Sequence, residues 1–451
     1  MRDSSERDPP PRCHPGTREK AAEDIVCWIE DTTPSSSVLW VNGRAGVGKS
    51  ALMQKIAERG GAYYGACFFF RRGIPGCNQK GFLFSTIAYQ LAMNVPGMYE
   101  YVDGAMSKDS SLPRMSATVQ VEQLIIEPSK LVRPILPHSL IIIIDGLDEC
   151  EDHDSQRDIL KLVVRTSMDP SVPFRFIIAS RPEHQICGVF NEEPLFSMTR
   201  RLVLDEEYDS SSDIERYLRD KFMEIHTRNR DIMRQIRPPW PSDGDLRNLV
   251  YRASGQFIYA STVIKFVGSF TNFLSPQEKL NIILKPGPMR ASAFSDLDRL
   301  YSQILLTYDD SKVLVHILGV VLALEAINTA LYYHYDLSTN AKVLADIAGI
   351  GEDKVQLVLC ALQSVTKVQV KPVYDSLDDA QPNGTTYQRV ELCHRSFHDF
   401  LTDSSRAGPF FINTGLCIGQ IVGRIFELAT VSIKKFKRCL LLVLASKNSS
   451  Y

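Results

Sequence analysis

A glycine-rich stretch of eight residues restricts the possible folds of this chain more than any other feature. Residues 43–50 read Gly-Arg-Ala-Gly-Val-Gly-Lys-Ser and fit the pattern G-x-x-x-x-G-K-[ST]. A short apolar run, residues 38–41, precedes them and predicts a buried strand, and residues 50–59 predict a helix. Such a loop between a strand and a helix binds phosphate, because its backbone N–H groups and the helix N-terminus face the anion. The sequence therefore predicts a site for a nucleoside triphosphate.

Each residue of this loop has an expected role. Lys49 neutralises the β and γ phosphate oxygens, and the hydroxyl group of Ser50 coordinates Mg²⁺. The whole loop is expected to contact the nucleotide, and it consists of Gly43, Arg44, Ala45, Gly46, Val47, Gly48, Lys49 and Ser50. A chance glycine-rich turn is the alternative, and the flanking strand and helix argue against it.

An acidic motif follows a second buried strand. Residues 140–149 read Leu-Ile-Ile-Ile-Ile-Asp-Gly-Leu-Asp-Glu, so Asp145 stands at the carboxyl end of the apolar run. We expect Asp145 to hold the Mg²⁺ hydration shell. Either Asp148 or Glu149 is expected to polarise the attacking water as general base, and the sequence does not choose between them.

A cation stands at the end of another predicted strand. Arg181 follows the apolar run at residues 174–179, where a guanidinium group could sense a γ-phosphate. An arginine after a strand is usually a surface residue, and the same caution applies to Arg71 and Arg72. Only the preceding motifs favour a catalytic role for Arg181.

The order of apolar runs predicts the fold class and the domains. Short β-prone runs at residues 38–41, 66–70, 140–144, 174–179 and 202–204 are separated by helical stretches, which indicates a parallel sheet with helices on both faces. Helical periodicity follows, with one hairpin predicted from 367–374 and 385–393, as in a winged helix. The expected domains are an N-terminal segment (1–37), an α/β nucleotide-binding domain (38–205), a helical domain (206–286), a winged-helix-like domain (291–405) and a C-terminal tail (406–451).

Composition excludes several classes of function. The net charge of −2 gives no field that would draw the whole chain to nucleic acid or to a membrane. The ten cysteines are scattered without zinc-ligand spacing, and no apolar stretch is long enough for a transmembrane helix. A cytoplasmic protein is therefore expected.

Four stretches together resemble NACHT-domain proteins of the fungal type. They are VLWVNGRAGVGKSALMQKIAE, GACFFFRRG followed by STIAYQLA, IIIIDGLDE, and FRFIIASRPE. The resemblance extends over about residues 13–411. NACHT proteins belong to the STAND class of P-loop NTPases, which are related to animal NOD-like receptors.

The resemblance implies further site residues and partners. It implies ATP or ADP as the nucleotide, with the strands of Asp145 and Arg181 beside the strand of the P-loop. His394 matches a winged-helix histidine that contacts the β-phosphate of ADP, and residues 15–18 resemble a segment that passes near the adenine. Homo-oligomers on activation are also implied.

The chain departs from the family because neither an effector region nor C-terminal repeats can be identified in it. It is expected to be a bare switch module, a truncated product, or a subunit whose effector or sensor acts in trans. A basic and apolar patch at residues 434–444 is compatible with a membrane surface, but an ordinary packed helix is favoured.

Three functions are compatible with these features. The first is a conformational switch in which slow Mg²⁺-dependent ATP hydrolysis controls opening and oligomerisation, and the resemblance implies a role in self/non-self recognition or cell death. The second is a nucleotide-binding scaffold that does not hydrolyse. The third, a DNA-binding regulator, is disfavoured because residues 291–405 contain 15 acidic and 8 basic residues and would repel a phosphate backbone.

Overall fold

The computed structural model describes residues 7, 9–31, 35–72, 74, 76–205, 207–269, 274–285, 295–330, 340–372 and 386–427. The chain forms two compact units, residues 1–264 and residues 265–451. Each unit is described by itself.

A five-stranded sheet forms the centre of the first unit. Its strands are β1 (Val38–Asn42), β2 (Tyr64–Phe69), β3 (Leu140–Asp145), β4 (Phe174–Ser180) and β5 (Thr199–Val203). They pair in the order β2-β3-β4-β1-β5, and every pair is parallel. The five predicted strands are thereby confirmed, with bounds that shift by one to three residues. The carboxyl ends of all five strands meet at one edge of the sheet, where ligands bind in folds of this kind.

Side chains alternate between the two faces of the sheet, and both faces are buried. In β3, Ile142 and Ile144 join one apolar core, whereas Ile141 and Ile143 join the other. Successive residues of a strand point to opposite faces, so a strand buried on both sides becomes a continuous apolar run. This is why the isoleucine run predicts a central strand rather than an edge.

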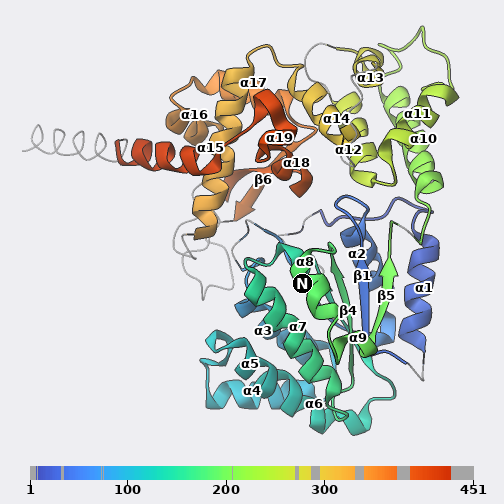
Figure 1. The fold of residues 1–451 in the computed structure, drawn as a ribbon, viewed down its shortest axis with the longest axis vertical. Coiled ribbons are helices and arrows are strands. Elements are labelled where there is room, and N and C mark those ends of the chain that lie inside the picture. Colours follow the sequence, from blue (N-terminus) through green and yellow to red (C-terminus); the bar gives the residue numbers. More distant parts are fainter. Residues whose placement is uncertain are drawn as a thin grey trace, which may run out of the picture. The chain divides into compact units, whose positions relative to one another are not determined.

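Helices cover both faces of the sheet (Figure 1). One core contains residues of α1 (Glu19–Glu30) and α2 (Lys49–Arg59). The other contains residues of α3 (Lys80–Asn94), α4 (Met98–Lys108), α5 (Ala117–Val121), α6 (Glu127–Val132), α7 (His153–Met168), α8 (His184–Phe190) and α9 (Leu195–Met198). The predicted α/β fold class is therefore confirmed.

A buried arginine fixes α1 to the sheet. Arg175 of β4 donates from Nη1 to the carbonyl oxygen of Trp28 at 2.7 Å and from Nη2 to that of Ser36 at 3.3 Å. Its guanidinium carbon lies 3.6 Å from the centre of the Trp28 ring, and burial lowers the pKa of Arg175 to about 10. These contacts satisfy carbonyl groups at the end of α1 and hold the N-terminal segment against the nucleotide-binding domain.

Helices follow the sheet. The first unit continues with α10 (Ser211–Arg228) and α11 (Asp243–Ala253), and α12 (Phe257–Gly268) starts within it. The second unit contains α13 (Pro276–Leu284), α14 (Ser295–Leu305), α15 (Ser311–Ala330), α16 (Ala341–Ala348), α17 (Glu352–Ala361), α18 (Arg395–Leu401) and α19 (Ser404–Ala407).

One hairpin lies among the helices of the second unit. Its strands β6 (Thr366–Pro372) and β7 (Thr386–Leu392) are antiparallel, as the sequence predicts. The name winged helix for this arrangement stays a prediction.

The basic patch at residues 434–444 lies outside the described residues. Among the described helices, no single one is long and apolar enough to cross a membrane. The bent pair Ser404–Phe410 and Thr414–Glu427 meets the length and composition test only when the two helices are taken together.

Candidate functional site

The phosphate-binding loop joins β1 to α2 at the carboxyl edge of the sheet. Gly48 immediately precedes the helix and has a φ of 96°, and Gly46 has a φ of 77°. Residues with a Cβ atom adopt such positive values only with strain, which explains the glycines at these two positions. The loop therefore has the backbone conformation that its sequence predicts.

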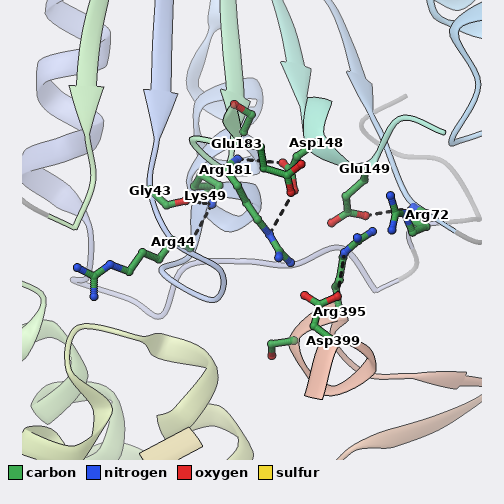
Figure 2. Close-up of polar contacts among 12 residues, drawn as sticks. Gly43, Arg44, Lys49, Arg72, Asp148, Glu149, Arg181, Glu183, Arg395 and Asp399 are labelled. Atoms are coloured by element: carbon green, nitrogen blue, oxygen red, sulfur yellow. Dashed lines mark hydrogen bonds and ion pairs between the residues drawn. The ribbon is translucent and has the colours of Figure 1, made fainter. Parts of the chain in front are cut away.

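Lys49 is held over the loop by its own backbone. Its ammonium group donates to the carbonyl oxygen of Gly43 at 2.6 Å and to that of Arg44 at 2.9 Å (Figure 2). An ammonium group has three N–H donors, so these two bonds orient the side chain and leave a third donor for a phosphate oxygen. Burial lowers the pKa of Lys49, and the charge of Asp148 opposes this shift.

Asp145 and Ser50, the two residues predicted to hold Mg²⁺, lie in contact with each other. The hydroxyl group of Ser50, at the start of α2, hydrogen-bonds to the carboxylate of Asp145, at the end of β3. Asp145 is 3% exposed, and its Oδ1 atom has no hydrogen-bond partner among the described residues. A buried carboxylate oxygen without a partner fits a Mg²⁺ site, because Mg²⁺ prefers oxygen ligands and one or two carboxylates.

Asp145 also makes the nucleotide-free protein sensitive to pH. Burial raises its pKa to about 6, although the Ser50 hydrogen bond and the charges of Arg7 and Lys49 oppose the shift. The folded chain then binds this proton more tightly than the unfolded chain does, so stability falls as pH rises from about 4 to about 6. We expect Asp145→Asn to raise the free energy of unfolding at pH 7.5 by roughly 2 to 3 kcal/mol, and to change it little near pH 4.

Denaturant unfolding without nucleotide or Mg²⁺ measures this difference. Asp154→Asn is the matched control, because the Asp154 side chain is 89% exposed. If the free energy of unfolding of Asp145→Asn equals that of wild type at both pH values, then Asp145 is not held in an unfavourable ionised state.

Asp148 and Arg181 form a buried ion pair. The backbone N–H of Arg181 donates to Oδ1 of Asp148 at 3.0 Å, and Nε of Arg181 lies 3.2 Å from Oδ2 (Figure 2). The Asp148 side chain is 4% exposed and the Arg181 side chain 20%. Asp148, one of the two candidate bases, and Arg181, the candidate phosphate sensor, are therefore brought together and bind each other.

Glu149 points in another direction, toward the loop after β2. Its Oε2 atom accepts a hydrogen bond from the backbone N–H of Arg72 at 3.1 Å (Figure 2). The 3₁₀ turn Leu147–Glu149 separates the two acids, since it turns Asp148 to β4 and Glu149 to the end of β2. The two candidate bases thus have different partners.

The strand order shows that one expectation was wrong in part. The resemblance implies that the strands of Asp145 and Arg181 both lie beside the P-loop strand. In the structure β4, which ends before Arg181, pairs with β1, whereas β3 lies one strand further out. Asp145 is still hydrogen-bonded to Ser50, because the P-loop places the start of α2 at the carboxyl edge of the sheet.

The start of α12 contacts the P-loop directly. The backbone N–H of Ile258 donates to the carbonyl oxygen of Gly46 at 3.0 Å. A Cβ atom on Gly46 would lie 2.0 Å from Cγ2 of Ile258 and 2.7 Å from its Cβ. Gly46 is therefore required both for its backbone conformation and for the close approach of α12.

We expect Gly46→Ala to lower the free energy of unfolding of the first unit by about 3 kcal/mol. Backbone strain at positive φ contributes about 1 kcal/mol, and the overlap with Ile258 contributes the remainder. Gly61→Ala is a matched control, because Gly61 also has a positive φ of 49° but nothing lies within 4 Å of its added Cβ. Thermal unfolding of both variants measures the difference, and equal losses would contradict the contact between Gly46 and Ile258.

Two further residues hold the P-loop from outside the sheet. Asp205, two residues after the end of β5, has its Oδ2 atom 3.2 Å from Nε of Arg44. Arg18, directly before α1, donates from Nη2 to the carbonyl oxygen of Val47 at 2.7 Å, and its guanidinium carbon lies 5.3 Å from the centre of the Phe257 ring. Arg18 is 4% exposed, and its Nε and Nη1 atoms have no hydrogen-bond partner among the described residues.

Sequence reasoning identified the loop, the acidic motif and Arg181, but it missed Asp205 and the contact of Ile258. The acid directly after the last strand was the only local signal for Asp205. The resemblance pointed to residues 15–18, but not to the hydrogen bond from Arg18 to Val47.

His394 lies in the second unit. It is the residue before α18, and its side chain accepts a hydrogen bond from the backbone N–H of Ser396. Its expected contact with a phosphate stays a prediction.

Comparisons with known proteins locate a match in the first unit. Residues 16–181 match the family model described as nephrocystin 3, N-terminal. None of the curated proteins that were compared matches the sequence.

Solved structures of low similarity were also found. Cdc6p from Pyrobaculum aerophilum is 13% identical over 91% of this chain and 94% of its own, with a TM-score of 0.36. The ORC1 protein of Aeropyrum pernix in complex with DNA is 13% identical over 86% and 91%, with a TM-score of 0.32. The ORC2 protein of the same organism, solved as ADPNP-ADP complexes, is 11% identical over 92% and 95%, with a TM-score of 0.33.

Proposed function

We propose that this chain, a P-loop NTPase that matches the nephrocystin 3 N-terminal family over residues 16–181, is a nucleotide-dependent switch of the NACHT type. In this proposal ADP stabilises a closed resting state, and exchange for ATP opens the chain and allows it to oligomerise. Slow hydrolysis returns it to the resting state. The proposed compartment is the cytoplasm, and the resemblance suggests a role in self/non-self recognition or cell death.

The proposal is based on three contacts that residues from separate segments of the chain make with the P-loop. Arg18 precedes the sheet, Asp205 follows it, and Ile258 lies in the first turn of α12. All three contact the loop between Gly43 and Val47. A nucleotide that reshapes this loop must change these contacts. Nucleotide binding is then linked to the positions of the segments around the loop. A ligand shifts the equilibrium between two arrangements of these segments by the difference in its affinity for them.

The residues of the site support a nucleotide with Mg²⁺ as the ligand. Lys49 and the loop N–H groups would bind the phosphates, and Ser50 with Asp145 would hold the metal ion. When bound, Mg²⁺ neutralises phosphate charge and polarises phosphoryl oxygens.

Glu149 is the better candidate for the general base. Both carboxylate oxygens of Asp148 are engaged by Arg181, and Asp148 is almost fully buried. We therefore propose that Asp148 restrains Arg181 and that Glu149 orients the water. Arg181 must leave Asp148 before it can reach a phosphate, which would make hydrolysis slow.

A scaffold that binds nucleotide without hydrolysing it is the alternative. Single-turnover hydrolysis separates the two proposals, because a scaffold releases no product at any time. DNA binding is not proposed, since the acidic excess of residues 291–405 opposes it.

The decisive experiment measures the identity and amount of nucleotide released from purified and denatured protein. Close to one ADP per chain from wild type, and none from Lys49→Ala, would support the closed switch. No bound nucleotide, together with no measurable ATP affinity, would rule the switch out.

A further inference from the structure

Trp40 binds the residue that directly precedes Arg181. It lies in the middle of β1, and its Nε1–H donates to the hydroxyl oxygen of Ser180, the last residue of β4, at 2.9 Å. Trp40 is 2% exposed, and Ser180 is fully buried. An indole N–H can only donate, and a buried donor that loses its acceptor costs free energy. This hydrogen bond therefore holds the end of β4 in one position.

The same indole ring holds the end of α8. Phe190 is the last residue of α8, and its ring stacks on that of Trp40 with ring centres 4.1 Å apart and an angle of 2° between the planes. Arg201 of β5 donates from Nη2 to the carbonyl oxygen of Phe190 at 2.6 Å, and its guanidinium carbon lies 5.4 Å from the centre of the Trp40 ring. Such ring contacts stabilise beyond the burial of their area. Residues 180–190 are thus held at both ends by one side chain.

Arg181 lies between these two anchors, at the carboxyl edge of the sheet (Figure 2). The strand register pairs Ser180 with Asn42, the residue before the P-loop. Burial lowers the pKa of Lys49 and the positive charge of Arg181 lowers it further, so the two cations lie near each other. With its backbone anchored at this level, Arg181 can exchange Asp148 for a phosphate by moving its side chain alone, and an anchored backbone keeps the geometry of that contact.

We propose that Trp40 is a positioning residue for Arg181: by holding both ends of residues 180–190, it fixes the backbone from which the guanidinium group reaches the γ-phosphate of bound ATP. The inference rests on the proposed nucleotide-binding function. ADP has no γ-phosphate, so the contribution of Trp40 appears in the affinity for ATP relative to that for ADP. Strand β1 then supports both the P-loop and the residue that distinguishes the two nucleotides.

A matched pair of tryptophan variants separates positioning from stability. Trp40→Phe keeps an aromatic ring for stacking but removes the N–H that Ser180 accepts. Trp28→Phe is the control, because Nε1 of Trp28 donates to the hydroxyl oxygen of Ser36, also at 2.9 Å, and Trp28 is 3% exposed. Both variants lose one buried hydrogen bond of the same kind, but Trp28 lies on α1 and not on the strand that precedes the P-loop.

Isothermal titration of the full chain with Mg²⁺ measures the affinities for ADP and for an ATP analogue that is not hydrolysed, and thermal unfolding is measured without nucleotide. We expect both variants to lower the melting temperature. In Trp40→Phe the affinity for the ATP analogue relative to ADP should fall about fivefold, which corresponds to the free energy of one hydrogen bond. In Trp28→Phe this ratio should equal that of wild type. A purely structural role of Trp40 would leave the ratio unchanged in both variants and would overturn the proposal.

The Arg181→Ala variant shows whether Trp40 acts through Arg181. Arg181→Ala should lower the ratio, and adding Trp40→Phe should lower it no further, because the side chain to be positioned is absent. A further fall of the same size would mean that Trp40 acts on the P-loop itself, and a wild-type ratio in Arg181→Ala would mean that Arg181 does not contact the γ-phosphate. Either result contradicts the inference while the proposed function stands. If wild type binds neither nucleotide, the proposed function fails, and the inference fails with it.

Discussion

Replacing Lys49 with alanine is expected to weaken nucleotide binding by about 1000-fold and to leave the fold intact. The ammonium group is held by the carbonyl oxygens of Gly43 and Arg44 and so is oriented before the ligand arrives. Loss of a buried charged partner of a phosphate costs about 4 kcal/mol, which is the stated factor. The fold should tolerate the change, because burial already disfavours the charged form of Lys49.

Isothermal titration with ADP and Mg²⁺ measures the affinity, and thermal unfolding without ligand measures the fold. Lys161→Ala is the matched control, since Lys161 is an exposed lysine of α7. An affinity of Lys49→Ala within tenfold of wild type would mean that the loop does not bind the phosphates as proposed.

The central sheet could be predicted because its signals are local. Each strand is a short run of apolar residues, and the loop after β1 has a spacing that few other structures require. The strand bounds were less certain because polar residues at the ends still pair. β5 begins at Thr199, where the exposed Arg200 and Arg201 hide the strand pattern.

The contacts around the P-loop could not be predicted from local patterns. Ile258 lies 212 residues after Gly46 in the sequence, and the hydrogen bond between them uses only backbone atoms. Asp205 and Arg18 are single charged residues without a spacing rule that connects them to the loop. Arg18 precedes α1, Asp205 follows β5 and Ile258 lies in α12, so their contacts depend on the packing of three separate elements. No short motif encodes that packing.

The ion pair of Asp148 and Arg181 could not be predicted from local patterns either. Each residue alone matches a catalytic pattern, and sequence reasoning gave the two residues separate roles. The structure joins them because β3 and β4 are neighbours, so residues just beyond their ends come within bonding distance. Asp148 therefore restrains Arg181, and in the proposed mechanism this restraint slows hydrolysis.

Replacing Glu149 with glutamine is expected to slow single-turnover hydrolysis of ATP by at least about 100-fold without weakening ADP binding. A general base contributes roughly 10² to 10⁴ to the rate, and the amide cannot accept the proton of water. The amide oxygen can still accept the hydrogen bond from the backbone N–H of Arg72, so the local fold should persist.

The Asp148→Asn variant tests whether Asp148 restrains Arg181 or acts as the general base. An amide oxygen can keep the bond from the Arg181 backbone, but it loses the charge that pairs with the guanidinium group. Arg181 would then leave more readily, and hydrolysis should become faster or stay unchanged. The opposite pattern, with Asp148→Asn inactive and Glu149→Gln active, would exchange the two roles. Hydrolysis is measured as product formed per enzyme-bound ATP, so a change in affinity cannot be mistaken for a change in chemistry.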